Sequence, residues 1–133
     1  VELKDESISH CGREEMIKKT AGVLYEVAEN TVIMSFDYEL CLKARDISWP
    51  QVGAVLETWS DLNSDIISQI EPDYIFVDQE MIPRDYDLNS CEVLQKSKLV
   101  AYEIDDIQTG RKLLERGVHM LETYEIEKFL GIP

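Results

Sequence analysis

Residues 32–36 read Val-Ile-Met-Ser-Phe, a run of β-branched and large apolar residues that is typical of a buried strand. The run follows Glu29-Asn30, which is a turn signal, and precedes Asp37, a residue type that often caps helices. The next residues predict a short helix over 38–46. This stretch therefore predicts one unit in which a strand is followed by a helix.

The same unit repeats along the chain. Apolar runs begin near residues 1, 32, 52, 74, 99 and 118, and helical patterns span residues 14–28, 38–46, 61–70, 91–96, 106–116 and 124–130. Steps of roughly 20 to 30 residues suit βα units, and short unbroken apolar runs are typical of parallel strands. We expect an α/β fold with one domain over residues 1–133. It would be either a doubly wound sheet or about six of the eight strands of a (β/α)₈ barrel.

Composition argues against several classes of partner. The 133 residues include 27 acidic and 13 basic side chains, which give a formal net charge of −14. Nucleic acids and anionic membranes bind clustered Lys and Arg, so neither is expected as a partner. No apolar run is long enough for a transmembrane segment. The absence of a P-loop and of a G-x-G-x-x-G motif argues against nucleotide binding.

Cysteine usage indicates the compartment. Cys11, Cys41 and Cys91 are widely spaced and form no C-x-x-C pair. We interpret them as reduced thiols, which is typical of a cytoplasmic protein.

Three stretches, taken in order, resemble the glycerophosphodiester phosphodiesterase family. Val1-Glu2-Leu3-Lys4 is similar to its Glu-x-Lys strand, and Met34-Ser35-Phe36-Asp37 to its Ser-Phe-Asp strand end. Arg45 and Pro50 follow at the family's spacing. Residues 100–123 resemble its Trp-Thr-Val-Asn strand, the next helix and the closing Gly-Val-Asp and Thr-Asp strand. Each motif is weak alone, and their common order is more specific.

The resemblance implies a (β/α)₈ barrel that hydrolyses glycerophosphodiesters to glycerol 3-phosphate and an alcohol, with a divalent cation and acid–base catalysis. It implies Glu2 as a ligand of Mg²⁺ or Ca²⁺ and Lys4 as a catalytic cation beside the phosphate. It also implies that Ser35, Phe36 and Tyr102 contact the substrate.

The sequence departs from the family's pattern in two ways. Tyr102-Glu103 stands where the family has Trp-Thr, and Thr123-Tyr124 stands where it has Thr-Asp. The chain matches barrel strands three to eight, without the family's His-Arg-Gly, Glu-x-Asp and His-Asp motifs. Neither His10, expected in the loop after the first strand, nor His119, expected in the last strand, matches those motifs. The chain is therefore expected to be an incomplete portion that is inactive by itself.

Plainer interpretations of the same residues stay open. Glu2 and Lys4 could be a simple ion pair on a strand, because side chains two apart share a face. Phe36 could fill the top of the barrel, and Tyr102 could pack in the core. Four further acidic residues at strand ends could form an electronegative mouth or be exposed loop charges: Glu57, Asp78, Glu80 and Glu122. Trp49 and Trp59 are expected to pack between helix and sheet.

A second functional hypothesis is a non-catalytic binding or interaction protein, because a barrel fold does not by itself imply catalysis. An incomplete barrel has two exposed edge strands, which favour pairing with a partner chain or with a second copy. A third, weaker alternative is a complete doubly wound domain with a ligand crevice where the strand order reverses.

Overall fold

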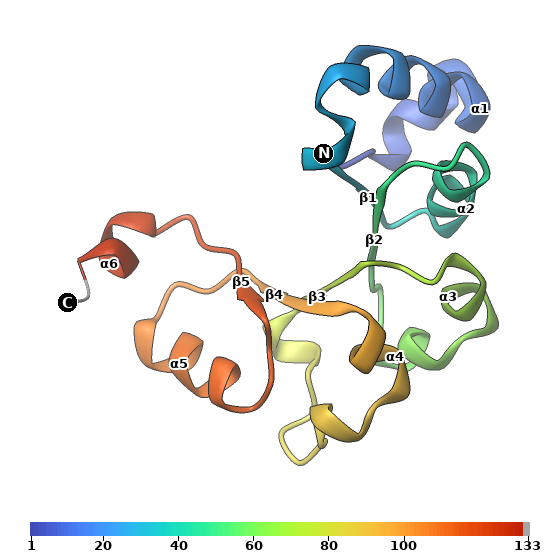
Figure 1. Cartoon of the computed structure of the whole chain (residues 1–133). Coiled ribbons are helices and arrows are strands. Elements are labelled where there is room, and N and C mark those ends of the chain that lie inside the picture. The colour runs from blue at the N-terminus through green and yellow to red at the C-terminus, as the bar shows by residue number, and fades with distance from the viewer. Residues whose placement is uncertain (132–133) are drawn as a thin grey trace.

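Five parallel strands alternate with helices in the computed structural model, which describes residues 1–131 (Figure 1). The strands are β1 (Val32–Ser35), β2 (Gln51–Val55), β3 (Tyr74–Asp78), β4 (Lys98–Tyr102) and β5 (Met120–Leu121). The α-helices are α1 (Asp5–Leu24), α2 (Tyr38–Asp46), α3 (Asp65–Ile70), α4 (Glu92–Lys96), α5 (Ile107–Glu115) and α6 (Ile126–Leu130). Short 3₁₀ helices are η1 (Tyr25–Asn30), η2 (Trp59–Asn63), η3 (Gln79–Met81) and η4 (Leu88–Ser90).

The strands form one sheet in the order β1-β2-β3-β4-β5, so each strand pairs with the next one in sequence. Every pairing is parallel, as in Ile33 beside Val52 and Ile75 beside Leu99. A doubly wound sheet needs a reversal in strand order, and this sheet has none. The doubly wound alternative is therefore wrong, and the α/β fold matches part of a barrel.

The first expected strand is shorter than predicted. Residues 1–3 lie beside β1, but only one bridge forms, between Glu2 and Met34. Leu3 N donates to Met34 O at 2.8 Å, and Met34 N donates to Val1 O at 2.9 Å. The described residues thus form five strands and one bridged segment, where the sequence predicted six strands.

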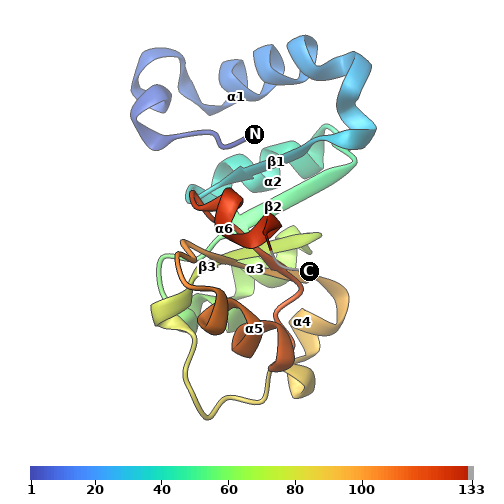
Figure 2. The same cartoon turned by 90° about the vertical axis from the view of Figure 1, so that its left-hand side faces the viewer.

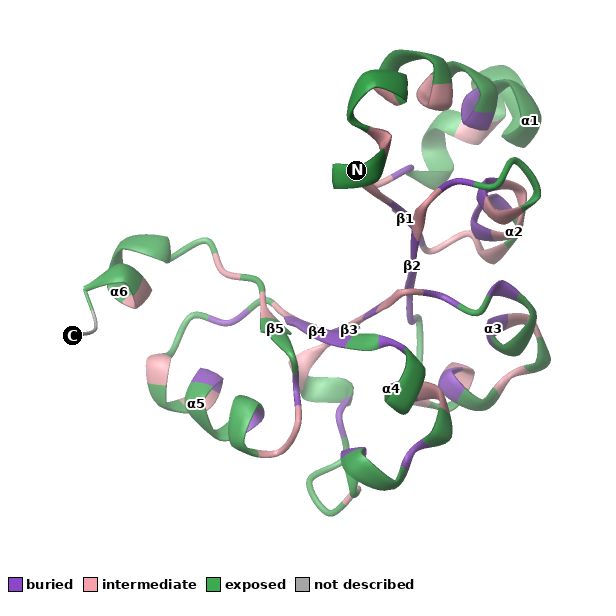
Figure 3. Ribbon diagram, viewed as in Figure 1, coloured by how far each residue is buried: buried purple, intermediate pink, exposed green. Residues whose placement is uncertain are grey.

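The helices α1 to α5 lie on the convex side of a curved sheet, as the two perpendicular views show (Figures 1 and 2). Right-handed crossovers between sequential parallel strands place every connecting helix on the same face. Alternate residues of the strands point to this helical side and are fully buried there, which Figure 3 shows as purple segments. They include Ile33, Val52, Ile75, Val77 and Leu99.

The opposite, concave face is less covered. Met34, Phe36, Tyr74 and Phe76 alternate with the buried residues, and each is only partly buried. Among the described helices, none of α1 to α5 lies on this face (Figures 1 and 2). In a closed barrel, the side chains of these four strand residues would fill the interior. The concave face is therefore the inner face of the sheet.

The helix predictions succeed for α2 and are less accurate elsewhere. Residues 38–46 form α2 as predicted, and Asp37 caps it by accepting a hydrogen bond from Leu40 N at 2.9 Å. Helix α1 begins at Asp5 and not at residue 14, so the prediction that His10 lies in a loop is wrong. Gly12, with φ of 75°, breaks the helical backbone inside α1 and interrupts the sequence pattern.

At the amino-terminal ends of the strands, the side chains of Arg45 and Asp73 form hydrogen bonds to backbone groups. Arg45 Nε donates to Ile70 O at 2.9 Å, and its Nη2 donates to Glu71 O at 2.5 Å. The same nitrogen lies 2.7 Å from Asp73 Oδ2. Asp73 in turn accepts a hydrogen bond from Val52 N at 2.8 Å. Arg45 therefore joins α2 to the start of β3.

Trp49 belongs to the hydrophobic core, and Trp59 packs against it. Trp49 is buried, and its Nε1 donates to Thr31 O at 3.0 Å. Trp59 packs edge-on against Tyr86, with ring centroids 5.2 Å apart.

Candidate functional site

A cavity of about 210 Å³ opens at the carboxyl-terminal ends of the strands, on the inner face. Successive strands contribute lining residues because strand side chains alternate with period two. The lining residues are Glu2, Lys4, Met34, Phe36, Val55, Phe76, Tyr102, Glu103, Glu122 and Tyr124. In parallel barrels this end of the strands holds the active site, so we treat this carboxyl-end cavity as the candidate site.

The curvature of the sheet brings the two edges of the sheet to this cavity. Glu2 belongs to the bridged segment beside β1, whereas Glu122 and Tyr124 follow β5 at the opposite edge. All three nevertheless line the same space. A flat sheet of this width could not bring its opposite edges together, so the arrangement is that of a curling barrel wall.

Glu2 and Lys4 form an ion pair, with Lys4 Nζ 3.2 Å from Glu2 Oε1. The Lys4 side chain is 64% exposed and that of Glu2 is 28% exposed, so solvent screens the pair. Both side chains face the cavity, as the spacing of two residues predicted. Lys4 is the only basic residue among the lining residues.

Phe36 and Tyr102 also line the cavity, but Ser35 does not. Ser35 is fully buried under the helices, where its hydroxyl donates to Leu3 O at 2.6 Å and accepts from Asp37 N at 3.0 Å. Adjacent strand residues point to opposite faces, so Ser35 and Phe36 cannot both face the cavity. Ser35 thus fixes the strand end and has no side-chain contact with the cavity.

The neighbouring loop residue Asp37 has a structural partner. Arg13 binds both of its carboxylate oxygens, with Nε to Oδ1 at 2.9 Å and Nη2 to Oδ2 at 2.5 Å. The hydrogen bonds from Arg13 and from Leu40 N hold the pKa of Asp37 below its usual value, against the opposing effect of burial. Asp37 is therefore a fixed anion that links α1 to α2.

Acidic side chains surround the two tyrosines that line the cavity near the ends of β4 and β5. Burial raises the pKa of Tyr102, and the charges of Asp78, Glu122 and Glu2 raise it further. The carboxylate of Glu103 raises the pKa of Tyr124. Both tyrosines are therefore neutral donors at physiological pH.

The expected metal site is incomplete in this part of the chain. Residues 1–131 contain no group of three or more His, Cys, Asp or Glu side chains arranged to hold a metal ion. Glu2, the residue that the motif suggested as a ligand, is paired with Lys4. Mg²⁺ and Ca²⁺ are bound by oxygen ligands that include water molecules as well as carboxylates.

Neither histidine reaches the cavity. His10 lies in α1, exposed to solvent. His119 precedes β5, and its Nδ1 accepts a hydrogen bond from Leu99 N at 3.0 Å. Neither is among the residues that line the cavity.

Of the four acidic residues that the sequence places at strand ends, one lines the cavity and three do not. Glu122 lines the cavity, but Glu57, Asp78 and Glu80 do not. Asp78 caps η3 by accepting a hydrogen bond from Glu80 N at 2.8 Å. Sequence reasoning noticed Glu103 and Tyr124 only as departures from family motifs, although both line the cavity.

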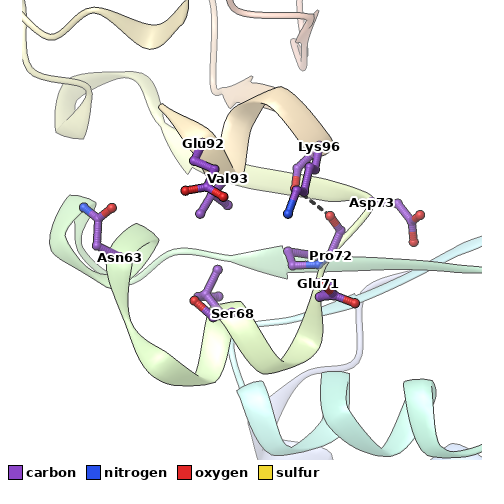
Figure 4. A pocket seen from close by; sticks show the side chains of 10 residues that line it. Asn63, Ser68, Glu71, Pro72, Asp73, Glu92, Val93 and Lys96 are labelled. Carbon is purple, nitrogen blue, oxygen red and sulfur yellow. Dashed lines mark hydrogen bonds between the residues drawn. The ribbon is translucent and has the colours of Figure 1, made fainter. Parts of the chain in front are cut away.

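A larger cavity, of about 490 Å³, lies between α3 and α4 on the helical side of the sheet (Figure 4). Ser68, Glu71, Pro72 and Lys96 are among its lining residues. Two of its lining residues are joined by a hydrogen bond, in which Ser97 Oγ donates to Pro72 O at 2.6 Å. It holds none of the residues that the sequence singled out and lies away from the carboxyl ends of the strands, so the smaller cavity remains the candidate site.

Within residues 1–131, no helix combines the length and apolar character needed to cross a membrane.

No protein-family model matches the chain, and no curated protein matches it either. Solved structures do match it. An Oleispira antarctica phosphodiesterase in complex with its product sn-glycerol-3-phosphate is 19% identical, with a TM-score of 0.72 over 97% of this chain and 52% of its own.

A glycerophosphodiester phosphodiesterase from Parabacteroides distasonis has a TM-score of 0.76 at 16% identity, over 97% of this chain and 55% of its own. The Thermotoga maritima enzyme has a TM-score of 0.68 at 17% identity, over 88% of this chain and 53% of its own. The chain spans about half the length of the enzymes it matches. The resemblance of its motifs is thus confirmed at the level of the fold: the chain has the fold of about half of a glycerophosphodiester phosphodiesterase barrel.

Proposed function

We propose that the chain forms part of a glycerophosphodiester phosphodiesterase. The reaction adds water to phosphorus and breaks one phosphoester bond, which releases glycerol 3-phosphate and an alcohol. The observation that carries the proposal is that Glu2, Lys4, Phe36 and Tyr102 line one cavity at the carboxyl ends of parallel strands. These residues come from three separate motifs of the family's ordered set.

Lys4 would neutralise negative charge on the phosphate in the transition state, which preorganised cations do effectively. Phe36 and Tyr102 would form the walls that hold the substrate. Ser35 would act indirectly, because its hydroxyl bonds to Leu3 O, next to Lys4. The role of Lys4 needs the inner face to be closed around the substrate, so that bulk solvent does not screen its charge.

Catalysis also needs groups that residues 1–131 do not bring together. Glu2 would be one ligand of a Mg²⁺ or Ca²⁺ ion, and the remaining ligands and the acid–base pair would come from a further segment or a partner chain. We therefore expect the 133-residue chain by itself to be inactive. A cytoplasmic location fits the reduced cysteines expected from the sequence.

The test is release of glycerol 3-phosphate from a glycerophosphodiester, measured with and without EDTA. We expect release, sensitive to EDTA, from the natural gene product that carries this chain, and none from the isolated chain. The proposal fails if that gene product releases no glycerol 3-phosphate in the presence of Mg²⁺ or Ca²⁺.

The partly covered inner face supports a second candidate, a non-catalytic interaction protein. Met34, Phe36, Tyr74 and Phe76 form an apolar face that helices α1 to α5 leave open. The bridged residues 1–3 and β5 are the two edges of the sheet, and each has one side free to pair. Light scattering tests self-pairing, which a stable monomer over the micromolar range would exclude.

A further inference from the structure

Lys4 lies on a segment of the chain that is weakly held. Residues 1–3 join the edge of the sheet through a single bridge, and helix α1 begins directly after Lys4. None of the described side chains over residues 4–15 is buried. Segments with few buried contacts open most easily. The position of the Lys4 ammonium group therefore depends on anchors that hold the backbone on either side of it.

Ser35 supplies the anchor before Lys4. Leu3 N donates to Met34 O at 2.8 Å, and the Ser35 hydroxyl donates to Leu3 O at 2.6 Å. The same hydroxyl accepts a hydrogen bond from Asp37 N at 3.0 Å, so its two partners fix its orientation. A buried hydroxyl is costly unless it is hydrogen-bonded, and Ser35 is fully buried. Its side chain thus ties the residue before Lys4 to the end of β1.

Arg13 supplies the anchor after Lys4. It is the first residue beyond the break in α1 at Gly12, and it binds both carboxylate oxygens of Asp37. A bidentate pair of this kind fixes the relative orientation of the two side chains. Asp37 is also the residue whose backbone N–H donates to Ser35. The two anchors therefore meet at one residue, and we call Ser35, Asp37 and Arg13 the β1-end clamp.

We propose that the β1-end clamp positions Lys4 at the carboxyl-end cavity. The inference rests on the proposed function for its catalytic meaning. It adds Asp37 and Arg13, neither of which lines the cavity, as positioning residues. Because the clamp holds the chain on both sides of Lys4, its loss frees the ammonium group to leave the place where it would face the phosphate. Misplacing such a group slows the chemical step more than it weakens substrate binding.

The structural test uses the 133-residue chain and a matched pair of serines. Ser97 is buried like Ser35, and its hydroxyl also donates to a backbone carbonyl, Pro72 O, at 2.6 Å. Amide hydrogen exchange, measured by NMR, reports how often each backbone hydrogen bond opens. Relative to the slowest core amides, the Leu3 amide should exchange roughly two- to tenfold faster in Ser35→Ala, as expected for the loss of one hydrogen bond. In Ser97→Ala this ratio should stay at its wild-type value, and equal ratios in the two variants would overturn the proposal.

A second matched pair avoids changes in the core. Arg13 and Lys43 each form an ion pair between α1 and the α2 region, with Asp37 and Glu14 respectively. Both basic side chains reach solvent, at 42% and 30% exposure, so their replacement leaves the core packing intact. Arg13→Gln should speed exchange of the Leu3 amide by a smaller factor than Ser35→Ala, and Lys43→Gln should leave it unchanged. If both variants change Leu3 exchange equally, Arg13 does not act through the clamp.

Reaction rates test the catalytic meaning in the natural gene product. Ser35→Ala should lower kcat for glycerol 3-phosphate release roughly three- to thirtyfold with KM little changed, and Ser97→Ala should leave both near their wild-type values. If Ser35→Ala lowers kcat no more than Ser97→Ala, or raises only KM, the positioning inference is overturned while the proposed function stands. If the wild-type gene product hydrolyses no diester, the proposed function fails, and the exchange measurements decide whether the clamp holds the chain around Lys4.

Discussion

The two ends of the strands use polar side chains in different ways. At the amino-terminal end, Arg45 and Asp73 bond to the backbone and to each other. At the carboxyl-terminal end, Glu103 and Glu122 face a cavity and form no salt bridge with another described residue. The first arrangement is expected to stabilise the fold, and the second leaves charges available for a ligand. The two ends of the strands therefore differ in how far their polar side chains are engaged with the rest of the chain, and in parallel barrels the carboxyl-terminal end is the one that holds the active site.

The inner face shows the same contrast within a single row of side chains. Lys98 begins β4 at the amino-terminal end, and its Nζ lies 5.3 Å from the centre of the Tyr74 ring. The Tyr74 hydroxyl donates to Gln51 Oε1 at 3.2 Å, so this end is occupied by mutual contacts. Lys4 lies on the same face at the opposite end, beside the cavity. The two lysines can therefore be compared directly.

The largest expected loss of stability comes from Arg45→Ala. This change removes three polar contacts and leaves the carbonyls of Ile70 and Glu71 without that donor. We expect the free energy of unfolding to fall by about 2 kcal/mol, since hydrogen bonds to charged groups contribute about 1.5–3 kcal/mol and solvent partly screens this site. Urea unfolding measures the loss, and Arg111→Ala on exposed α5 is the control. A loss no larger than that of the control would show that the amino-terminal network is not structural.

A smaller effect is expected from Asp37→Asn, which removes the charge of a carboxylate that Arg13 and the backbone of α2 already bind. Asparagine keeps the cap but loses the charge that binds Arg13. The wild type should be more stable by about 1 kcal/mol at neutral pH, the difference between charged and neutral hydrogen bonds.

The pH dependence follows from the lowered pKa of Asp37. A carboxyl whose pKa is lower in the folded state contributes stability above its unfolded pKa of about 3.9, and this contribution is lost as the pH falls through the folded pKa. The stability difference between the wild type and Asp37→Asn should be constant above about pH 5 and shrink in more acidic solution. Unfolding curves at several pH values check this; a difference that stays constant down to pH 2 would contradict the role of the charge.

The smallest effect on stability is expected from Glu122→Gln. Glu122 is exposed and forms no salt bridge within the described residues, so removing its charge should change the unfolding free energy by less than about 0.5 kcal/mol. Thermal unfolding of this variant beside Arg45→Ala sharpens the comparison. If Glu122→Gln cost as much stability as Arg45→Ala, the carboxyl-terminal charges would be structural too.

Much of the fold could be predicted because its signals are local. The strand over residues 32–36 and the capped helix over 38–46 depend on short patterns, and both appear as expected. The start of α1 was missed because Gly12 interrupts the periodicity, although Asp5 and Glu6 suit the first turn of a helix. The pairing of residues 1–3 depends on β1, which lies far along the sequence.

The site could be predicted only in part. Glu2 and Lys4 were placed on the correct face, because alternation along a strand is a property of the backbone. Ser35 and Phe36 were both taken from a resemblance, which could not show that adjacent residues diverge. Glu103 and Tyr124 join Glu2 only through the curvature of the sheet, and curvature has no local sequence signal.

The central claim is that the carboxyl-end cavity acts on glycerophosphodiesters. The most direct test compares glycerol 3-phosphate release by the natural gene product carrying Lys4→Met with release by the same protein carrying Lys98→Met. We predict that Lys4→Met lowers the rate roughly a hundredfold or more, as expected for loss of a charge that stabilises the transition state, and that Lys98→Met leaves the rate unchanged. If Lys4→Met retained the full rate, or if both variants lost activity equally, the assignment of this cavity as the active site would be contradicted.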